Sequence, residues 1–504
     1  MERRDFLKTS GLIIAGATLT PGLIMCQSHD TDKRNKAMLN LFGVTENDLK
    51  KVIAAALEKG GDYADLFFEN TFSNSLTLRD GSVNRTSADI DYGAGIRVLS
   101  GERTGYAYTE NVSTDEMLKA ARTAATIASL GPKIPSLKIE EKKYDNFYPV
   151  DTKWEDISIN QKSPLIQQLN KKIFELDSRV IKATINLYDS SSYIMFFDSD
   201  GRLCSDYRPM YALSAVCVME SDGKIENAYA AKSFRKSIET ITDDMIDAIA
   251  KKAVDEASLM FEAVRPKGGE MPVVMGAGGS GILLHEAIGH AFEADFNRKN
   301  ISIFSDKLGE QICETNINVV DDGTMPGFRG SINFDDEGNP SQKTYIVKDG
   351  VLASYLHDKI SAEYYKVPTT GNGRRESFRY APIPRMRLTY MEAGNVSQED
   401  IIASVKNGVF VENFSNGQVQ IGEGDFTFFV KSGRLIENGK LTAPIKDINI
   451  IGNGPKALAD VSMVADNLII DDSTWTCGKD GQGVPVSQGM PSLLVKKLTV
   501  GGTA

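Results

Sequence analysis

One stretch near the middle of the chain constrains both fold and chemistry: residues 281–298, GILLHEAIGHAFEADFNR. It follows an apolar, strand-like run from Met271 to Met275 and holds two of the chain's four histidines, His285 and His290, with Glu286 beside the first. The pattern is HExxxH, one residue longer than the HExxH helix of zinc proteases. Because histidine is scarce in this chain, the pattern favours a metal-binding, catalytic helix over two histidines that happen to share a helix.

The extra residue has a geometric consequence. Side chains four residues apart lie on one face of a straight α-helix, so such a pair can hold one ion. A spacing of five rotates His290 by roughly 140° from His285 on an ideal helix, and the two then cannot easily meet a single Zn²⁺. A single-turn π-bulge absorbs one residue and returns the pair to one face. Because Gly289 lacks a Cβ and weakens the regular helix, we predict a widened or broken helix between the two histidines.

Length and charge bound the class of protein. A chain of 504 residues is long enough for two or three domains with substantial cores. The formal net charge of -11 and the lack of a long basic run argue against nucleic acid as a partner. No stretch has the ~20 apolar residues that a bilayer-spanning helix needs.

The N-terminus differs from the rest. Residues 1–26 combine a charged start, MERRDFLK, with a short apolar run, and the pair Arg3–Arg4 resembles a twin-arginine export signal. Cys26 ends that run and loosely resembles a lipoprotein cleavage site, although Met25 is a poor match for it. The alternative is an apolar N-terminal helix of the mature domain. We expect an exported, periplasmic or lipid-anchored bacterial protein rather than a cytoplasmic one, with residues 27–36 as a polar tether.

Periodicity divides the remainder into three units and predicts an α+β, multi-domain chain. Residues 37–150 and 151–265 mix helices with strands, and residues 266–504 form a β-rich C-terminal domain that carries the HExxxH helix. Asp349–Gly350, between two apolar alternations, predicts a β-hairpin. The expected helices are Glu46–Lys59, Thr114–Ser129, Pro164–Leu176 and Asp243–Phe261.

Two histidines do not complete a catalytic zinc site, which usually takes three protein ligands and leaves a position for water. Spacing alone leaves three candidates for the third: Asp295, five residues past His290, His357 in LHDK, and Cys477 in a polar, glycine-rich loop. Cys204, Cys217 and Cys313 are expected to be buried free thiols, with a disulfide between some pair left open.

A rival interpretation rests on the glycines before the helix. Gly276 to Gly281 match GxGxxG after a strand, the pattern of a dinucleotide-binding turn. That fingerprint also needs a second parallel strand ending in an acidic residue about twenty positions on. The region at that distance, AFEADFNRKN, is polar and lacks strand character, so we expect these glycines only to allow a sharp strand-to-helix turn.

Longer stretches then add a family resemblance. They are ADLFFE (64–69), GAGIRVLSGERTGYAY (93–108), VVDDGTMPGFRGSINFDDEGNP (319–340), PTTGNGRRES (368–377), LIENGKLTAPIKDINIIGNGPKAL (435–458) and TCGKDGQGVPV (476–486). Together with HEAIGHAFEADFNRK they resemble the TldD subgroup of the TldD/PmbA metalloproteases, over nearly all of the chain after its N-terminal segment. The subgroup's HExxxH is intact, so the chain resembles the catalytic subunit type.

The resemblance implies a site and a reaction. It implies one Zn²⁺ per chain on His285, His290 and Cys477, with Glu286 as the general base that activates a zinc-bound water against a peptide bond. The group that stabilises the oxyanion is open; His357, Arg374 and Arg375 are candidates, and a solvated surface role is the alternative for the two arginines.

The resemblance also implies partners. Substrates would be small or unfolded peptides, which could pair with an exposed strand edge. A dimer would enclose the site, either a homodimer or a heterodimer with a PmbA-like chain. The competing hypothesis is a non-catalytic peptide-binding or structural subunit with a structural zinc, in which Glu286 would be dispensable.

Overall fold

The computed structural model describes residues 31–79, 81–128 and 137–501. The expected export signal at residues 1–26, with Cys26, lies outside this part of the chain. Within it, no helix is long and apolar enough to cross a membrane.

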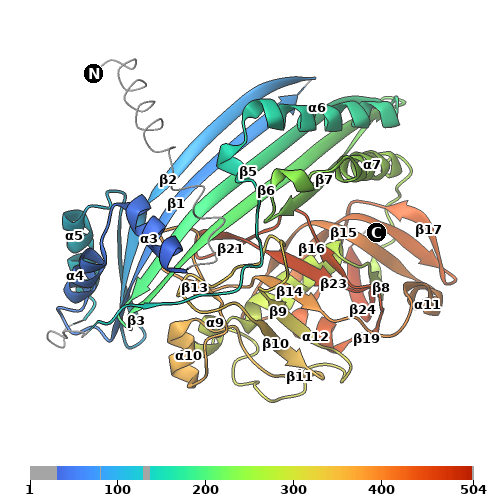
Figure 1. Cartoon of the computed structure of the whole chain (residues 1–504). Helices are drawn as coiled ribbons and strands as arrows, with labels where there is room; N and C mark the ends of the chain where they lie inside the picture. Colours follow the sequence, from blue (N-terminus) through green and yellow to red (C-terminus); the bar gives the residue numbers. More distant parts are fainter. Residues whose placement is uncertain (1–30, 80, 129–136, 502–504) are drawn as a thin grey trace.

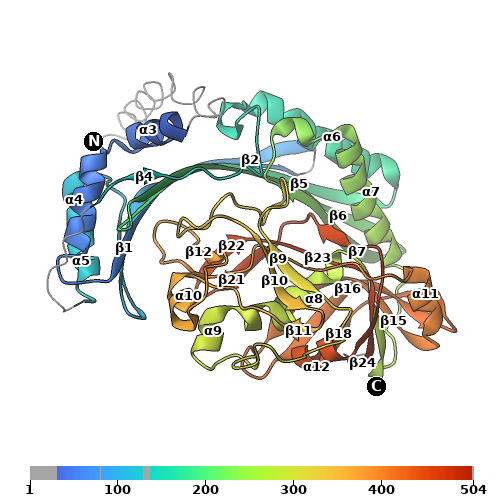
Figure 2. The same cartoon turned by 60° about the horizontal axis from the view of Figure 1, so that its bottom comes forward.

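The first half of the chain is organised on one long, curved sheet (Figures 1 and 2). Its strand order is β3-β2-β1-β5-β6-β4, and β7 also pairs with β6. β1 and β5 pair along almost their whole length, from Asp65 opposite Asp198 to Arg79 opposite Thr184. The two N-terminal units expected from the sequence therefore share a single sheet. The strands are β1 (Tyr63–Arg79), β2 (Ser82–Ser100), β3 (Arg103–Thr109), β4 (Glu140–Glu141), β5 (Val180–Asp198), β6 (Arg202–Ser221) and β7 (Lys224–Phe234).

Five helices cover the outer face of this sheet, and Figure 2 shows the sheet arching over the C-terminal domain on its other face. Apolar side chains of α3, α4 and α5 pack on one end of the sheet, and those of α6 and α7 pack on the other. These helices are α3 (Thr31–Phe42), α4 (Glu46–Ala56), α5 (Thr114–Ala125), α6 (Ile159–Leu176) and α7 (Asp243–Leu259). The helices predicted at the positions of α4, α5, α6 and α7 are confirmed, with shifts at their ends.

Helix α3 differs from the expectation of a polar tether over residues 27–36. Its residues 31–36 are helical, and Asn35 is fully buried, where it accepts a hydrogen bond from the Ser205 hydroxyl at 2.6 Å. Asn35, Met38 and Phe42 recur every three or four residues and so share the helix face that packs on the sheet. Because residues 27–36 are mostly polar, the narrow face of α3 that packs on the sheet could not be recognised from composition.

The C-terminal domain is β-rich, as predicted, and contains a closed five-stranded barrel. Each barrel strand pairs with two others in the order β15-β8-β24-β18-β16, and β16 returns to β15. The barrel strands are β8 (Gly269–Met275), β15 (Asn407–Val419), β16 (Asp425–Glu437), β18 (Ile448–Asn453) and β24 (Leu493–Gly501). β17 (Lys440–Ile445) and β19 (Val461–Val464) extend it, and α11 (Gln398–Ser404) and α12 (Gly454–Ala459) lie between strands in sequence.

A second sheet of the C-terminal domain has the order β11-β10-β9-β14-β23-β20. Its strands are β9 (Val319–Asp322), β10 (Lys343–Lys348), β11 (Val351–Leu352), β14 (Leu388–Met391), β20 (Ile469–Asp471) and β23 (Ser487–Met490). The hairpin predicted at Asp349–Gly350 joins β10 to β11, and both turn residues have positive φ, 51° and 76°. Short pieces complete the domain: α10 (Lys359–Tyr365), β12 (Gly373–Arg374) and β13 (Ile383–Pro384).

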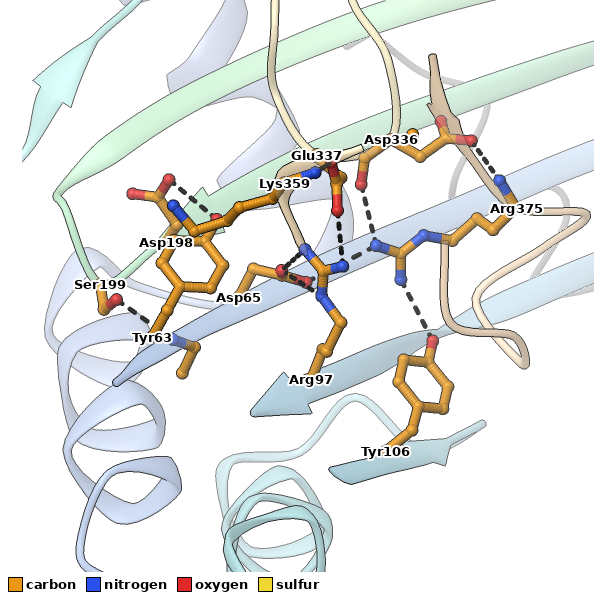
Figure 3. A network of polar contacts seen from close by, with 12 residues as sticks. Tyr63, Asp65, Arg97, Tyr106, Asp198, Ser199, Asp336, Glu337, Lys359 and Arg375 are labelled. Atoms are coloured by element: carbon orange, nitrogen blue, oxygen red, sulfur yellow. Dashed lines mark hydrogen bonds and ion pairs between the residues drawn. The ribbon is translucent and has the colours of Figure 1, made fainter. Parts of the chain in front are cut away.

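Buried ion pairs fix the sheet to the C-terminal domain (Figure 3). Arg97 of β2 donates to Asp65 of β1 at 2.7 Å and to Glu337 of the C-terminal domain at 2.6 Å. The second carboxylate oxygen of Glu337 accepts from the backbone N–H of Lys359 at the start of α10, at 2.7 Å. Nearby, the Arg375 guanidinium donates to the Tyr106 hydroxyl of β3 at 3.2 Å. We call Asp65, Arg97 and Glu337 the junction triad.

Candidate metal centre

The HExxxH segment departs from regular α geometry where the spacing predicts it. After β8 the chain forms η3 (Gly279–Gly281) and α8 (Ile282–Leu284), then a π-helical turn, η4 (His285–Gly289), followed by η5 (His290–Phe292) and α9 (Ala294–Arg298). The π-turn absorbs the extra residue, so the two imidazole rings lie close, with centroids 5.2 Å apart. A Cβ at Gly289 would lie 2.4 Å from Met386 Sδ, so the widened turn also needs glycine for close packing.

A hairpin near the C-terminus brings a thiol to the two histidines. Cys477 lies on β21 (Thr476–Lys479), which pairs with β22 (Gln482–Pro485). Ligand-capable atoms of His285, His290 and Cys477 all lie within 4.8 Å of one another, and Cys477 Sγ is 3.4 Å from His290 Nε2. All three side chains are buried. Segments almost two hundred residues apart in sequence thus place three metal-binding atoms around one point.

His285 shows that this cluster fits a metal ion. Its Nδ1 and Nε2 are both buried and have no hydrogen-bond partner among the described residues. A buried polar group without a partner costs on the order of 1–3 kcal/mol, so the described part of the chain leaves the ring a place for an outside partner. Two imidazoles and a thiolate are a donor set that Zn²⁺ accepts well.

The charges around the cluster point the same way. Burial by itself would lower the pKa of His290, but the negative charges of Glu293 and Cys477 raise it well above its ordinary value. Burial would raise the pKa of Cys477, yet the two histidines lower it well below its ordinary value. A lowered pKa favours the thiolate form of Cys477, which is the form that binds metals.

Glu286 lies beside the cluster and opens to solvent. Its side chain is 27 % exposed, and its carboxylate is 3.8 Å from His290 Nε2. Glu286 and His290 line a cleft of about 930 Å³ between the π-turn, the β21–β22 hairpin and the outer wall of the barrel. The rest of the lining mixes apolar side chains with amides, hydroxyls and carboxylates: Phe296, Val419, Ile421, Ile451, Gln418, Gln420, Thr427, Thr499, Asp425 and Asp480. A carboxylate at the mouth of a metal-binding cluster is well placed to exchange protons with a molecule in the cleft.

The other two candidates for a third ligand lie elsewhere. Asp295 is paired with Lys479 at 2.7 Å and is not part of the His–His–Cys cluster. His357 is buried beside Tyr355 and Tyr365 and lines a different hollow of about 400 Å³. Burial lowers the pKa of His357 to about 4. Of the three residues that spacing left open, only Cys477 meets the two histidines.

The two arginines considered for oxyanion stabilisation are structural. Arg374 is buried and donates to the backbone carbonyls of Met386 and Pro485 at 2.7 and 2.8 Å. Arg375 is buried in the network beneath the sheet (Figure 3). A solvated surface role is therefore wrong for both, because each guanidinium is needed to satisfy buried acceptors.

The glycine-rich turn does not form a dinucleotide-binding unit. β8, which precedes it, lies between β15 and β24 in the barrel, and the next strand along the chain, β9, belongs to the other sheet. A Cβ at Gly279 would lie 2.0 Å from Asn413 Oδ1, and one at Gly281 would lie 3.2 Å from the Gly489 backbone. These glycines let the turn pack closely against neighbouring strands, as expected for a sharp strand-to-helix turn.

Two residues that support the cluster were missed by reasoning from sequence. Glu293 accepts a hydrogen bond from His290 Nδ1 at 2.9 Å, which turns Nε2 toward Cys477. Arg385 donates to the backbone carbonyls of Cys477 and Gln482 and so holds both strands of the hairpin. The spacing of three between His290 and Glu293 was a usable signal, whereas nothing in the sequence marks Arg385.

Comparisons with known proteins identify the family of the chain. Three domain models match: PmbA/TldA metallopeptidase domain 1 over residues 64–128, the central domain over 152–261 and the C-terminal domain over 268–502. A metalloprotease TldD homolog of Haemophilus influenzae is 39% identical over 501 residues, covering 97% of this chain and 99% of that protein. A zinc metalloprotease TldD homolog of Saccharolobus solfataricus is 27% identical, covering 90% and 99%.

Solved structures share the fold. TldE from Thermococcus kodakarensis has a TM-score of 0.71 at 18% identity, covering 90% of this chain and 100% of that one. A Thermotoga maritima protein described as a modulator of a DNA gyrase has a TM-score of 0.74 at 22% identity, covering 90% and 99%. At these identities the likeness speaks for the fold alone.

Proposed function

The chain belongs to the PmbA/TldD family of metallopeptidases, and on that premise we propose that it is a zinc-dependent peptidase whose site is His285, His290, Cys477 and Glu286. The observation that carries the proposal is the buried His–His–Cys cluster, in which His285 has no hydrogen-bond partner among the described residues. The partly exposed Glu286 at the edge of that cluster distinguishes a catalytic site from a closed structural one.

The residues divide the chemical work. A zinc ion held by His285, His290 and Cys477 would supply Lewis acidity and a bound water of lowered pKa. Glu286 accepts the proton of the attacking water and passes it to the leaving amine. Glu293 keeps His290 Nδ1 protonated, which leaves Nε2 as the ligand atom. Burial of the cluster beneath the β21–β22 hairpin restricts access to the side where Glu286 lies.

The cleft indicates what the site would accept. A hollow of about 930 Å³ has room for several residues of an extended peptide, but a folded protein would not enter it. Its apolar walls would take hydrophobic side chains, and Asp425 and Asp480 would favour basic over acidic ones. Lys479 is the only lysine or arginine among the described residues that line it. We therefore propose small or unfolded peptides as substrates, with pairing to a strand edge as one mode of binding.

A dimer is part of this proposal. We propose a complex of this chain with a PmbA/TldE-like partner, a protein of the same fold. A homodimer is the alternative. Sedimentation of the purified chain, alone and after mixing with such a partner, separates the two arrangements.

The competing function is a non-catalytic subunit with a structural zinc. It predicts that Glu286 is dispensable, so Glu286→Gln is the deciding variant because it keeps the shape and removes the base. The matched control is Glu423→Gln, at an exposed carboxylate between the cleft-lining residues 417–421 and 425–427. We expect Glu286→Gln to keep its zinc and to lose peptide cleavage by about 10²–10⁴-fold. Cleavage at the wild-type rate by zinc-loaded Glu286→Gln would reject the catalytic role.

Export is a separate proposal that rests on residues 1–26. Replacing Arg3–Arg4 by two lysines should leave precursor in the cytoplasm, and an unchanged location would reject the twin-arginine route. Replacing Cys26 by serine should release the protein from the membrane fraction if that cysteine carries a lipid. If the Cys26→Ser variant is found in the membrane fraction to the same extent as the wild type, the lipid anchor is rejected.

A further inference from the structure

Lys479 is a second functional side chain on the strand that carries Cys477. The two residues are separated by one position on β21, so their side chains leave the strand on the same side. Cys477 meets His290, and Lys479 meets the segment just after it, at Glu293 and Asp295. The hairpin is therefore joined to the HExxxH segment at two neighbouring points, one through sulfur and one through an ammonium group.

The ammonium group has a complete set of partners. It donates to Asp295 at 2.7 Å, to Glu293 at 3.0 Å and to the backbone carbonyl of Pro384 at 3.1 Å. A lysine ammonium has three N–H donors, so each donor is used. The Lys479 side chain is 3 % exposed, and the two carboxylates are similarly buried. Because all three ammonium donors are used inside the protein, the Lys479 head group has one geometry, unlike that of a solvated lysine.

Glu293 connects this ion group to the metal cluster. A single carboxylate oxygen, Oε2, accepts from both His290 Nδ1 and Lys479 Nζ. The position of the His290 ring is thereby tied to Lys479, and Lys479 is fixed to the same strand as Cys477. The relative positions of His290 Nε2 and Cys477 Sγ are thus fixed by protein contacts alone, through Glu293 and Lys479.

The charges explain why a cation is needed at position 479. The carboxylates of Glu293 and Asp295 are both buried and both reach Lys479 Nζ, at 3.0 and 2.7 Å. Without Lys479 these two carboxylates would lose their shared partner and repel each other.

We propose that Lys479 is a positioning residue that locks the Cys477 hairpin onto the HExxxH segment and, through Glu293, orients His290 for metal binding. This inference rests on the proposed function for the identity of the metal site, whereas the contacts of Lys479 themselves are made to protein groups alone. It does not make Lys479 a catalytic residue, because its three donors are used within the chain.

The first experiment measures the lock in metal-free protein. Hydrogen exchange of the hairpin, residues 476–485, is compared among the wild type, Lys479→Met and the double variant Lys479→Met/Asp295→Asn. The double variant removes the unpaired charge, so it keeps the protein folded if Lys479→Met alone does not. We expect faster exchange in both variants. The control is Lys496→Met, an exposed lysine of β24, which should leave the exchange of the hairpin unchanged.

The second experiment measures zinc affinity by competition with a chelator in the same proteins. Loss of a group that orients a ligand typically weakens metal binding about 10–100-fold, and we expect that range for the double variant and for Glu293→Gln. Cobalt substitution adds a readout besides activity. The thiolate-to-cobalt charge-transfer absorption band should shift when Lys479 no longer fixes the hairpin that carries Cys477. Hairpin exchange at the wild-type rate, or wild-type zinc affinity in the double variant, would overturn the proposal.

The two failures can be told apart. Wild-type protein that binds no zinc would refute the proposed function, whereas the exchange of the hairpin would still test the lock. Wild-type protein that binds zinc and cleaves peptides, together with unchanged zinc affinity in the double variant, would refute only the role of Lys479.

Discussion

Two buried polar clusters in this molecule, the junction triad and the metal centre, differ in the kind of groups that they bring together. In the junction triad the Arg97 guanidinium lies between the carboxylates of Asp65 and Glu337, so opposite charges meet within the chain (Figure 3). In the metal centre the two nitrogens of His285 are buried with no hydrogen-bond partner among the described residues. The first cluster pairs its charges within the chain and serves the fold, even though Asp65 Oδ1 and one Arg97 nitrogen form no hydrogen bond within the described part of the chain. In the second, three atoms that can bind a metal converge at one point, and this convergence makes it the candidate functional site.

The largest expected effect breaks the junction triad. Arg97→Met keeps the volume but leaves Asp65 and Glu337 as buried charges without their partner, which should lower the free energy of unfolding by about 3–5 kcal/mol. Chemical denaturation measures this, with and without zinc, and the loss should be the same in both. Arg103→Met, an exposed arginine of β3, is the control and should change stability by less than about 0.5 kcal/mol. If zinc restored the stability lost in Arg97→Met, the junction triad and the metal centre would be coupled, and the two clusters would not be separate in function.

A smaller effect concerns Glu69 of β1, which is buried and accepts hydrogen bonds from the Thr71 hydroxyl and from the Phe378 backbone N–H. Burial raises its pKa to about 7. The folded chain therefore holds a proton that the unfolded chain has lost between about pH 4.5 and 7, so this group makes stability fall as pH rises through that window. Glu69→Gln should be near neutral below it and stabilising by on the order of 1–3 kcal/mol at about pH 8.

Thermal and chemical unfolding across pH measures this difference. Glu220→Gln, at an exposed glutamate of β6, is the control and should follow the wild type at every pH. A Glu69→Gln variant whose stability relative to wild type does not change with pH would show that Glu69 titrates normally.

The smallest expected effect is in the cleft. Asp480→Lys should lower kcat/KM for peptides with basic side chains and raise it for acidic ones, by only a few-fold, because the position is exposed and screened by salt. Cleavage of matched peptides that differ in one Lys-to-Glu exchange measures the switch. An equal effect on both peptides would assign Asp480 to the hairpin turn rather than to substrate selection.

Local features of the fold could be predicted from the sequence. Five-residue spacing and Gly289 together were enough to predict a distorted helix, and the structure has a π-turn there. The Asp349–Gly350 hairpin and the β-rich C-terminal domain were predictable for the same reason, since each depends on residues close in sequence.

Features that depend on distant residues were not predictable in this way. Spacing could not choose Cys477 over Asp295 and His357, because the choice is made by folding across 187 positions. The pairing of β1 with β5 joins two units that look separate in the sequence. The burial of Arg374 and Arg375 could not be predicted either, because Arg374 donates to backbone carbonyls and Arg375 donates to Tyr106 of the distant sheet. Partners that meet only in the folded chain leave no local pattern.

The central claim is that His285, His290 and Cys477 hold one metal ion. Equilibrium dialysis of the metal-free chain against zinc, followed by metal analysis, tests it directly in the wild type and in His285→Ala. The account predicts about one zinc per wild-type chain and a large loss of zinc affinity in His285→Ala. A wild type that binds no zinc, or a His285→Ala variant that binds it with unchanged affinity, would contradict it.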